Sequence, residues 1–277
     1  MKNAHVWLWM LPVVLAYGCD GGPTTPTPTP SVETLAELPN APTSTVDGRL
    51  TCMGKKPPAA APGAMELTGY VRTLADPDAK QPVPPATVEA FLPDGTSLGS
   101  GGVDVTKGGR IAITVPIKAA GFEGYAVVSQ TGYLDFRLQS SRAKTTTDLD
   151  GWAWLTTPGE IDSRAKALGF DVKAGTGILV GAVHDCDGFG MSNAVVVVGS
   201  GNHLVYYVEG FDISPARPYS SSTGRFVAAN LDPGTVTVKA FGRVDAGGPL
   251  TLLSSAQVTV EAGRMSAIDL QPRTGLK

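Results

Sequence analysis

Glycine and proline are unusually frequent in this chain of 277 residues. With 34 Gly and 22 Pro they make up about 20% of it, whereas about 12% is typical, and only 17% of the residues are charged against about 25% on average. This mixture excludes helix bundles and coiled coils, which need charged faces and few helix breakers. A hydrophobic content of 42% allows packed cores, and a net charge of −3 provides no electrostatic footprint for nucleic acid. The sequence therefore predicts an all-β, turn-rich protein without a nucleic-acid partner.

The first 18 residues (1–18) predict an export signal. Lys2 precedes an apolar run over residues 6–16, which is shorter than the roughly 20 residues of a bilayer span but suits the core of a signal peptide. The stretch LAYGC at residues 15–19 resembles the lipobox of bacterial lipoproteins. The resemblance implies cleavage before Cys19 and lipid on its thiol and new amine, which would make the membrane a partner. The alternative is an ordinary signal peptide followed by an unmodified Cys19.

Residues 19–64 predict a disordered linker rich in Pro, Thr and Ala, with a short ordered piece near Cys52. Alternating Thr and Pro over residues 24–30 removes a backbone donor at every second position and fixes φ, which favours extended polyproline II structure. Such a spacer rises about 3.1 Å per residue and holds a folded body away from a membrane. We therefore expect an exported protein, lipid-anchored in the bacterial envelope at the periplasmic face or the cell surface.

The chain has three cysteines, Cys19, Cys52 and Cys186. If Cys19 carries lipid, two thiols remain in an oxidising compartment, where such leftover pairs usually form a disulfide. A bridge between Cys52 and Cys186 would close a loop of about 134 residues, and the chain-entropy model gives it at most about 5 kcal/mol. The alternative is a pair of unlinked, buried thiols.

Residues 65–156 predict a first β-sandwich of short strands and turns. The turn PDG at residues 93–95 has a clear mechanism, because Pro presets φ and Gly accepts positive φ. Thr131 and Gly132 indicate a tight hairpin between the last two strands. The predicted strands span residues 67–74, 86–92, 110–116, 124–130 and 133–138.

A single helix is predicted within the connecting segment 157–174. Thr157 and Glu160 form a capping-box pattern, and Pro158 occupies the first helical position between them. Gly169 stands where the residue after a helix end is usually Gly.

Residues 175–277 predict a second β-sandwich that repeats the first one. The segment 69–71 corresponds to 181–183, and the segment GRI at 109–111 corresponds to GRF at 224–226. The offset of about 110–115 residues is the size of one sandwich domain. The predicted strands span residues 178–184, 193–198, 224–228, 235–241, 250–260 and 265–270.

The second half resembles a carboxypeptidase regulatory-like domain. The resemblance rests on GAVHD at residues 181–185, NAVVV at 193–197, where Asn193 replaces a Gly of the family, and above all TGRF at 223–226 followed by LDPGTVTV at 231–238. It implies a seven-stranded Greek-key, transthyretin-like sandwich without catalysis. The predicted fold is accordingly all-β: two tandem seven-stranded Greek-key (transthyretin/Ig-like) β-sandwiches with one short linking helix.

Candidate chemistry is sparse in this sequence. His184 and His203 lack the spacing of a zinc site, and no Gly-x-Ser-x-Gly elbow occurs, so we expect neither an enzyme nor a metal or other cofactor. The DCDG sequence at residues 185–188 is similar to the start of a calcium loop, but the acidic ligands of an EF-hand do not follow it. A turn beside a disulfide is the favoured interpretation.

Aromatic residues provide the candidate binding site. Trp152 and Trp154 share one strand face, and Tyr206, Tyr207 and Tyr219 crowd an insertion of the second half. Exposed rings would stack on sugars, whereas buried rings would fill cores or cover the helix. The leading hypothesis is a structural or adhesive surface module with a glycan or an envelope protein as partner. The alternative hypothesis is a carbohydrate- or peptidoglycan-binding module that uses these aromatic side chains.

Overall fold

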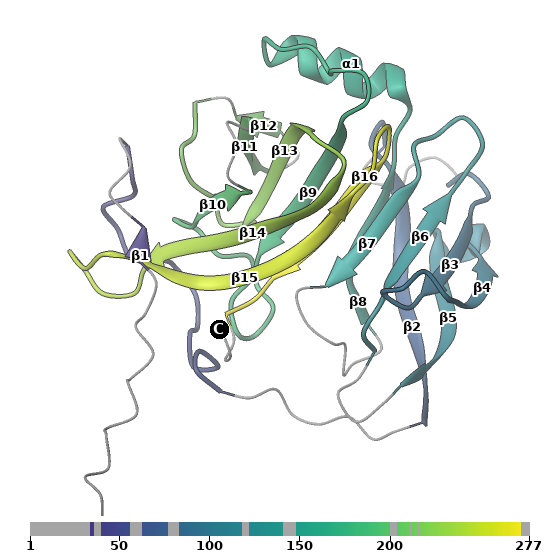
Figure 1. The fold of residues 1–277 in the computed structure, drawn as a ribbon, viewed down its shortest axis with the longest axis horizontal. Helices are drawn as coiled ribbons and strands as arrows, with labels where there is room; N and C mark the ends of the chain where they lie inside the picture. The colour runs from purple at the N-terminus through teal and green to yellow at the C-terminus, as the bar shows by residue number, and fades with distance from the viewer. Residues whose placement is uncertain are drawn as a thin grey trace, which may run out of the picture. The chain divides into compact units, whose positions relative to one another are not determined.

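The fold is known from a computed structural model, which describes residues 34–35, 40–55, 63–76, 83–117, 122–140, 148–199, 204–210, 212–214 and 216–272 (Figure 1). The predicted signal peptide, Cys19, the Thr-Pro stretch and His203 lie outside the described residues. The described chain forms strands in three sheets and one α-helix, which confirms the all-β prediction. Among these residues, no helix has the length and apolar character needed to cross a membrane.

The first sandwich packs a three-stranded sheet, in the order β5-β2-β8, against the strands β4-β3-β6-β7. Inward and outward side chains alternate, so that Ile111, Ile113 and Val115 of one strand are buried. The Gly-rich strand β4 was not predicted, because SLGSGG has few side chains that favour a strand. The strands are β2 (Gly63–Thr73), β3 (Thr87–Phe91), β4 (Ser97–Gly102), β5 (Arg110–Ile117), β6 (Tyr125–Ser129), β7 (Phe136–Ser140) and β8 (Asp148–Leu155).

The second sandwich packs the strands β10-β14-β15 against β11-β13-β9-β16, with the short strands β1 and β12 at two edges. Leu179, Phe226 and Leu253 are among the fully buried side chains between the two layers. The strands are β1 (Thr34–Leu35), β9 (Gly177–Val183), β10 (Val195–Val198), β11 (Leu204–Glu209), β12 (Asp212–Ser214), β13 (Arg225–Leu231), β14 (Gly234–Arg243), β15 (Leu250–Val260) and β16 (Met265–Leu270).

The two sandwiches repeat each other, as predicted, and even individual hydrogen bonds correspond. In the first sandwich the amide of Val71 donates to Gly109 O at 2.8 Å, and in the second the amide of Val183 donates to Gly224 O at 2.9 Å. Both glycines have positive φ, and a Cβ added to either would lie within 2.6 Å of the carbonyl oxygen of that valine. The parallel pairs β2·β8 and β9·β16 also correspond. Both halves therefore use glycine for the same close approach of two strands.

The two sandwiches share one sheet instead of following each other as separate bodies. Strand β7 of the first pairs in parallel with β16 of the second, which produces a nine-stranded sheet (Figure 1). Polar contacts reinforce the seam: Arg137 Nη1 lies 2.6 Å from Glu261 Oε1, and the amide of Thr259 donates to Gln139 Oε1 at 3.2 Å. Consequently the buried face of the first sandwich continues onto the outer face of the second.

The helix α1 (Pro158–Ala167) follows β8 and has the predicted start. The amide of Glu160 donates to Thr157 Oγ1 at 3.2 Å, and the amide of Thr157 donates to Glu160 Oε2 at 2.7 Å. Gly169 has a φ of 82°, as expected after a helix end. Instead of serving only as a connector, α1 contributes side chains to the lining of a groove described below.

Part of the range predicted as linker is folded against the second sandwich. Val46 enters that core, and its amide donates to Arg243 O at 2.9 Å. The predicted disulfide between Cys52 and Cys186 is present, with a Cα–Cα distance of 5.5 Å. The ordered piece predicted near Cys52 is present, whereas the linker interpretation is wrong for residues 40–48, because a polar and Pro-rich composition does not reveal docking onto a strand distant in the sequence.

Candidate functional site

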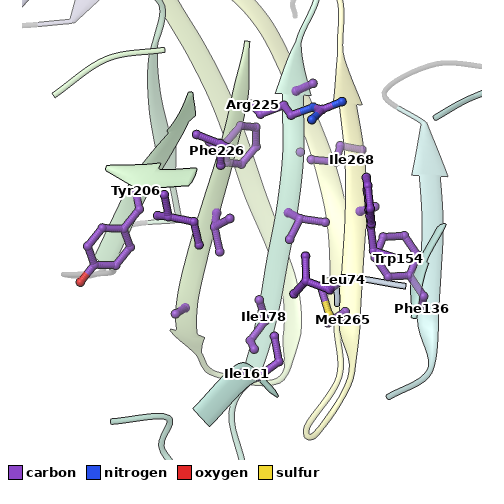
Figure 2. Close-up of a pocket in the computed structure, with 18 of the residues that line it drawn as sticks. Leu74, Phe136, Trp154, Ile161, Ile178, Tyr206, Arg225, Phe226, Met265 and Ile268 are labelled. Atoms are coloured by element: carbon purple, nitrogen blue, oxygen red, sulfur yellow. The ribbon is translucent and has the colours of Figure 1, made fainter. Parts of the chain in front are cut away.

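A groove of about 470 Å³ lies on the outer face of the second sandwich (Figure 2). We call it the sheet groove. Strand alternation explains its position, because Leu179 and Val183 of β9 point into the core whereas Ile178, Val180 and Ala182 point to the opposite face. Its lining comes from β7, β8, β9, β11, β12, β13, β16 and α1.

The floor of the sheet groove is aliphatic. Val180 and Ala267 are neighbours across the parallel pair of β9 and β16, and Val227 faces Val180 from β13. Ile178 and Met265 belong to the same buried cluster as the core of the first sandwich. The floor is therefore the continuation of a hydrophobic core beyond the strands that cover it.

Aromatic rings and α1 form the walls. Figure 2 places Trp154 beside Phe136 and Met265, and Tyr206 on the other side of the groove. The Tyr206 ring stacks on Phe170 with centroids 5.3 Å apart. Ile161, Ala165 and Leu168 come from α1 and its end, and Arg164 Nη2 donates to Leu74 O at 3.2 Å. This bond ties the helix to the first sandwich.

The end of the groove away from Ile161 and Ile178 is polar (Figure 2). His184 Nδ1 and Asp269 Oδ1 lie 2.5 Å apart. Asp269 and Gln271 are each only 6% exposed, yet among the described residues Asp269 Oδ2 and Gln271 Oε1 have no hydrogen-bond partner. Arg225 lines the same end, where its Nη1 donates to Gly210 O at 3.3 Å and burial lowers its pKa. Two buried acceptors thus lack a donor at this end, which is costly unless a ligand or water supplies one.

The structure does not bring all of the predicted aromatic residues together at one site. Trp154 and Tyr206 both line the sheet groove and are half-buried, and burial raises the pKa of Tyr206. Tyr219 packs against a buried cluster at the other sheet, to which Val195 and Phe241 belong. The side chain of Trp152 lies outside what the structure describes.

Tyr207 was predicted as a ligand-binding aromatic residue, and this is wrong. It is 3% exposed and its hydroxyl accepts the amide of Val196 at 2.8 Å, while burial raises its pKa to about 12 despite that hydrogen bond. The reason is strand alternation: Tyr206 and Tyr207 are neighbours in β11, so one side chain faces the groove and the other faces the core.

The turn at residues 185–188 is structural. Asp185 is buried, and its carboxylate accepts the amides of Arg49, Asp187 and Phe189 at 2.9–3.0 Å. Burial alone would raise the pKa of this carboxyl, but the backbone donors outweigh burial and lower it. Within the described ranges, no group of three His, Cys, Asp or Glu side chains could hold a metal ion. The oxygens of Asp185 hold the turn beside the disulfide, which is the structure that was favoured for residues 185–188.

The sequence contained one signal for the groove that was not used. Strand β9 reads GILVGAV and is apolar on both faces, which is typical of strands covered on both sides. Asp269 and Gln271 gave no such signal, since a single polar residue at a strand end is common on any surface.

Comparisons with known proteins give little further guidance. No protein-family model matches the chain, and no curated protein matches it. Similar solved structures include the Bacillus anthracis TIE protein (13% identity, TM-score 0.25, covering 76% of this chain and 34% of that chain). The Streptococcal ancillary pilin has 13% identity and a TM-score of 0.20, with coverages of 76% and 62%. Two B repeat units of the collagen binding protein of Staphylococcus aureus have 14% identity and a TM-score of 0.21, with coverages of 78% and 51%.

The chain spans less than two thirds of the length of each of these three structures. TM-scores this low carry no argument about the fold or function of this protein. The arguments that follow therefore rest on the residues themselves.

Proposed function

We propose that this protein is an exported, membrane-anchored, non-catalytic surface module that acts adhesively by holding an envelope component in the sheet groove. The observation that carries the proposal is the groove itself: an aliphatic floor that ends at two buried acceptors without donors. Pockets of about 300–1,000 Å³ with an apolar lining and a few convergent polar groups are the usual form of ligand sites.

Export is supported by the disulfide between Cys52 and Cys186, because such bonds persist in oxidising compartments. Anchoring is supported by the resemblance of residues 15–19 to a lipobox and by the Thr-Pro spacer that follows Cys19. The resemblance of residues 175–271 to carboxypeptidase regulatory-like domains favours an accessory role without catalysis. An aliphatic floor also supplies contact area and no reactive group, which suits retention of a ligand.

A capture experiment tests this function. The full-length protein would be incubated with fractionated envelope material and compared with Ala267→Trp, which fills the floor, and with Thr235→Trp, which alters an exposed position on β14. We expect capture by the native chain and by the Thr235 variant, and loss of capture by the Ala267 variant. Equal capture by all three proteins would contradict the proposal, and thermal unfolding of each variant checks that it is folded.

Binding of carbohydrate is the second candidate, because Trp154 and Tyr206 offer rings inside the groove. It would use the groove instead of a flat exposed platform, since Tyr207 is buried. A glycan array probed with the native chain and with Trp154→Ala distinguishes this candidate: binding that disappears in the variant supports it, and no binding by the native chain contradicts it.

A further inference from the structure

We propose that the ligand of the sheet groove is a single-chain amphiphile, whose hydrocarbon chain lies on the aliphatic floor and whose head donates hydrogen bonds to Asp269 and Gln271. This inference rests on the proposed function and names the chemistry of its ligand. It follows from the order of side chains along two strands, from the hydrogen bonding of those strands, and from the unpaired acceptors.

The lining changes from apolar to polar along both central strands. On β16 and just beyond it the outward positions are Met265, Ala267, Asp269 and Gln271. In the parallel neighbour β9, apolar residues lie opposite the apolar residues of β16; Ile178, for example, lies opposite Met265. Six residues of strand cover about 20 Å. The groove is therefore a track with an apolar end near α1 and a polar end about 20 Å away, which is the polarity pattern of an amphiphile.

A peptide would fit this floor poorly. The backbone of β9 is already paired with β13 on one side and with β16 on the other, so this central part of the floor is a sheet face without a strand edge. Peptide recognition by strand addition needs such an edge. Backbone amides laid on the aliphatic floor would lose their water without gaining partners, at a cost of about 1–3 kcal/mol for each group. A hydrocarbon chain has no polar groups to satisfy.

The polar end selects the head group. Asp269 Oδ2 and Gln271 Oε1 are acceptors, so a head with N–H or O–H donors would satisfy them. An ammonium head would in addition meet the charge of the Asp269 carboxylate, whose other oxygen contacts His184. Arg225 is the nearby cation: it lines the same end from β13, opposite Ala182 in the same register row as Asp269, and its Nη1 donates to Gly210 O. We therefore expect an amine or hydroxyl head to bind better than a carboxylate head.

Calorimetric titration of the full-length protein tests the head and the chain separately. Decylamine and decanoate, both below their micelle concentrations, share a chain and differ in the head, while butylamine has the amine head with a short chain. We expect decylamine to bind at least tenfold more tightly than decanoate, and butylamine not to bind measurably. Equal binding of decylamine and decanoate, or of decylamine and butylamine, would overturn the proposal.

Variants locate the site. Ala267→Trp should abolish decylamine binding, and Ala182→Trp is a second block of the floor in case the first variant does not fold. Asp269→Asn should remove most of the preference for the amine over the carboxylate, whereas the surface variant Thr235→Trp should bind as the native chain does. Unchanged decylamine binding in a folded floor variant would overturn the proposal.

The capture experiment separates this inference from the function on which it rests. If neither amphiphile binds but Ala267→Trp still abolishes capture of envelope material, the amphiphile proposal is overturned and the adhesive function stands. If decylamine binds as expected while capture is unaffected by Ala267→Trp, the adhesive function is overturned. Mass spectrometry of organic extracts from the purified chain gives a further readout: a co-purified single-chain amphiphile supports the proposal, and a peptide in its place contradicts it.

Discussion

The two sandwiches have the same strand plan but differ in the outer face of the equivalent sheet. In the first, β2 presents Glu66 and Thr68 outward, and the neighbouring strand β5 is exposed on that side. In the second, the equivalent positions of β9 are Ile178 and Val180, which form the groove floor. Both halves have the same pairing at equivalent strand contacts, such as Gly69 with Ile111 and Gly181 with Phe226.

A second difference concerns β4 of the first sandwich and its equivalent in the second, β11. In the first sandwich β4 pairs with β3, whereas in the second β11 pairs with β13 and so joins the other sheet. This placement brings Tyr206 and Val208 to the groove wall. The comparison shows that the buried half of a sandwich can stay constant while outward positions and one strand create a binding face.

The largest effect is expected from loss of the disulfide that links the segment near Cys52 to the second sandwich. The double variant Cys52→Ser with Cys186→Ser should lose about 3–5 kcal/mol of unfolding free energy, because a bridge across a long loop constrains the unfolded chain. Urea unfolding of the full-length protein measures the loss. Reductant should destabilise the native protein by a similar amount and leave the double variant unchanged; a reductant effect on the double variant would show another cause.

The paired glycines test whether the two halves unfold together. Gly224→Ala should cost about 3 kcal/mol and Gly109→Ala about 2 kcal/mol, because the added Cβ meets a carbonyl oxygen and positive φ strains alanine. Thermal unfolding should show one transition that both variants lower, since the halves share a sheet. Two transitions, each shifted by one variant only, would show that the shared sheet does not couple them.

Asp185 and Thr73 lie at equivalent strand ends of the two sandwiches, and each accepts at least one backbone amide in a turn. Their replacement should change the free energy of unfolding by a smaller amount. Asp185→Ala should cost about 2 kcal/mol at neutral pH, whereas Thr73→Ala, whose hydroxyl accepts the amide of Asp76, should cost about 0.5–1 kcal/mol. Because folding lowers the pKa of Asp185, its contribution is present above the unfolded pKa of about 3.9 and is lost as the pH falls through the folded value.

Urea unfolding at pH 7 and at pH 3 measures this dependence. The gap between the native protein and the Asp185 variant should narrow at the lower pH, while the gap for the Thr73 variant should stay constant. A constant gap for Asp185 would mean that its charge does not contribute.

A small effect is also expected at Asn193. This residue has a φ of 62° and its Nδ2 donates to Thr45 O at 2.9 Å. Asn193→Ala should cost about 1 kcal/mol, because alanine neither tolerates positive φ nor makes the bond. Asn193→Gly should cost less, since glycine keeps the backbone conformation. Equal losses in both variants, measured by thermal unfolding, would assign the effect to the bond alone.

Local patterns in the sequence predicted the local structure well. Alternation located the core of strands such as β5, the Thr157–Glu160 pattern marked the helix start, and the pairing of Cys52 with Cys186 followed from the number of thiols. Long-range pairing was not predictable in this way. The parallel contact of β7 with β16 joins segments more than 120 residues apart, and nothing in either strand indicates its partner.

The candidate site was predictable only in part for the same reason. Trp154 and Tyr206 were identified as candidates because of their size, but two adjacent tyrosines in a strand cannot both face a ligand, and the sequence did not decide between Tyr206 and Tyr207. The polar end depends on Asp269 and on Gln271 just beyond β16. Asp269 lies beside Ala182 of β9 in the sheet, although the two residues are far apart in the sequence.

The disulfide also determines how mechanical tension would travel through the molecule. The segment from Cys52 to Cys186 contains every strand of the first sandwich, and the bond closes that segment into a loop. When the chain is pulled from its N-terminal side against a ligand held by the second sandwich, tension that reaches Cys52 passes directly to Cys186 through the covalent bond. The first sandwich is thereby shielded from load along the backbone, and reduction of one bond would place it in series with the force.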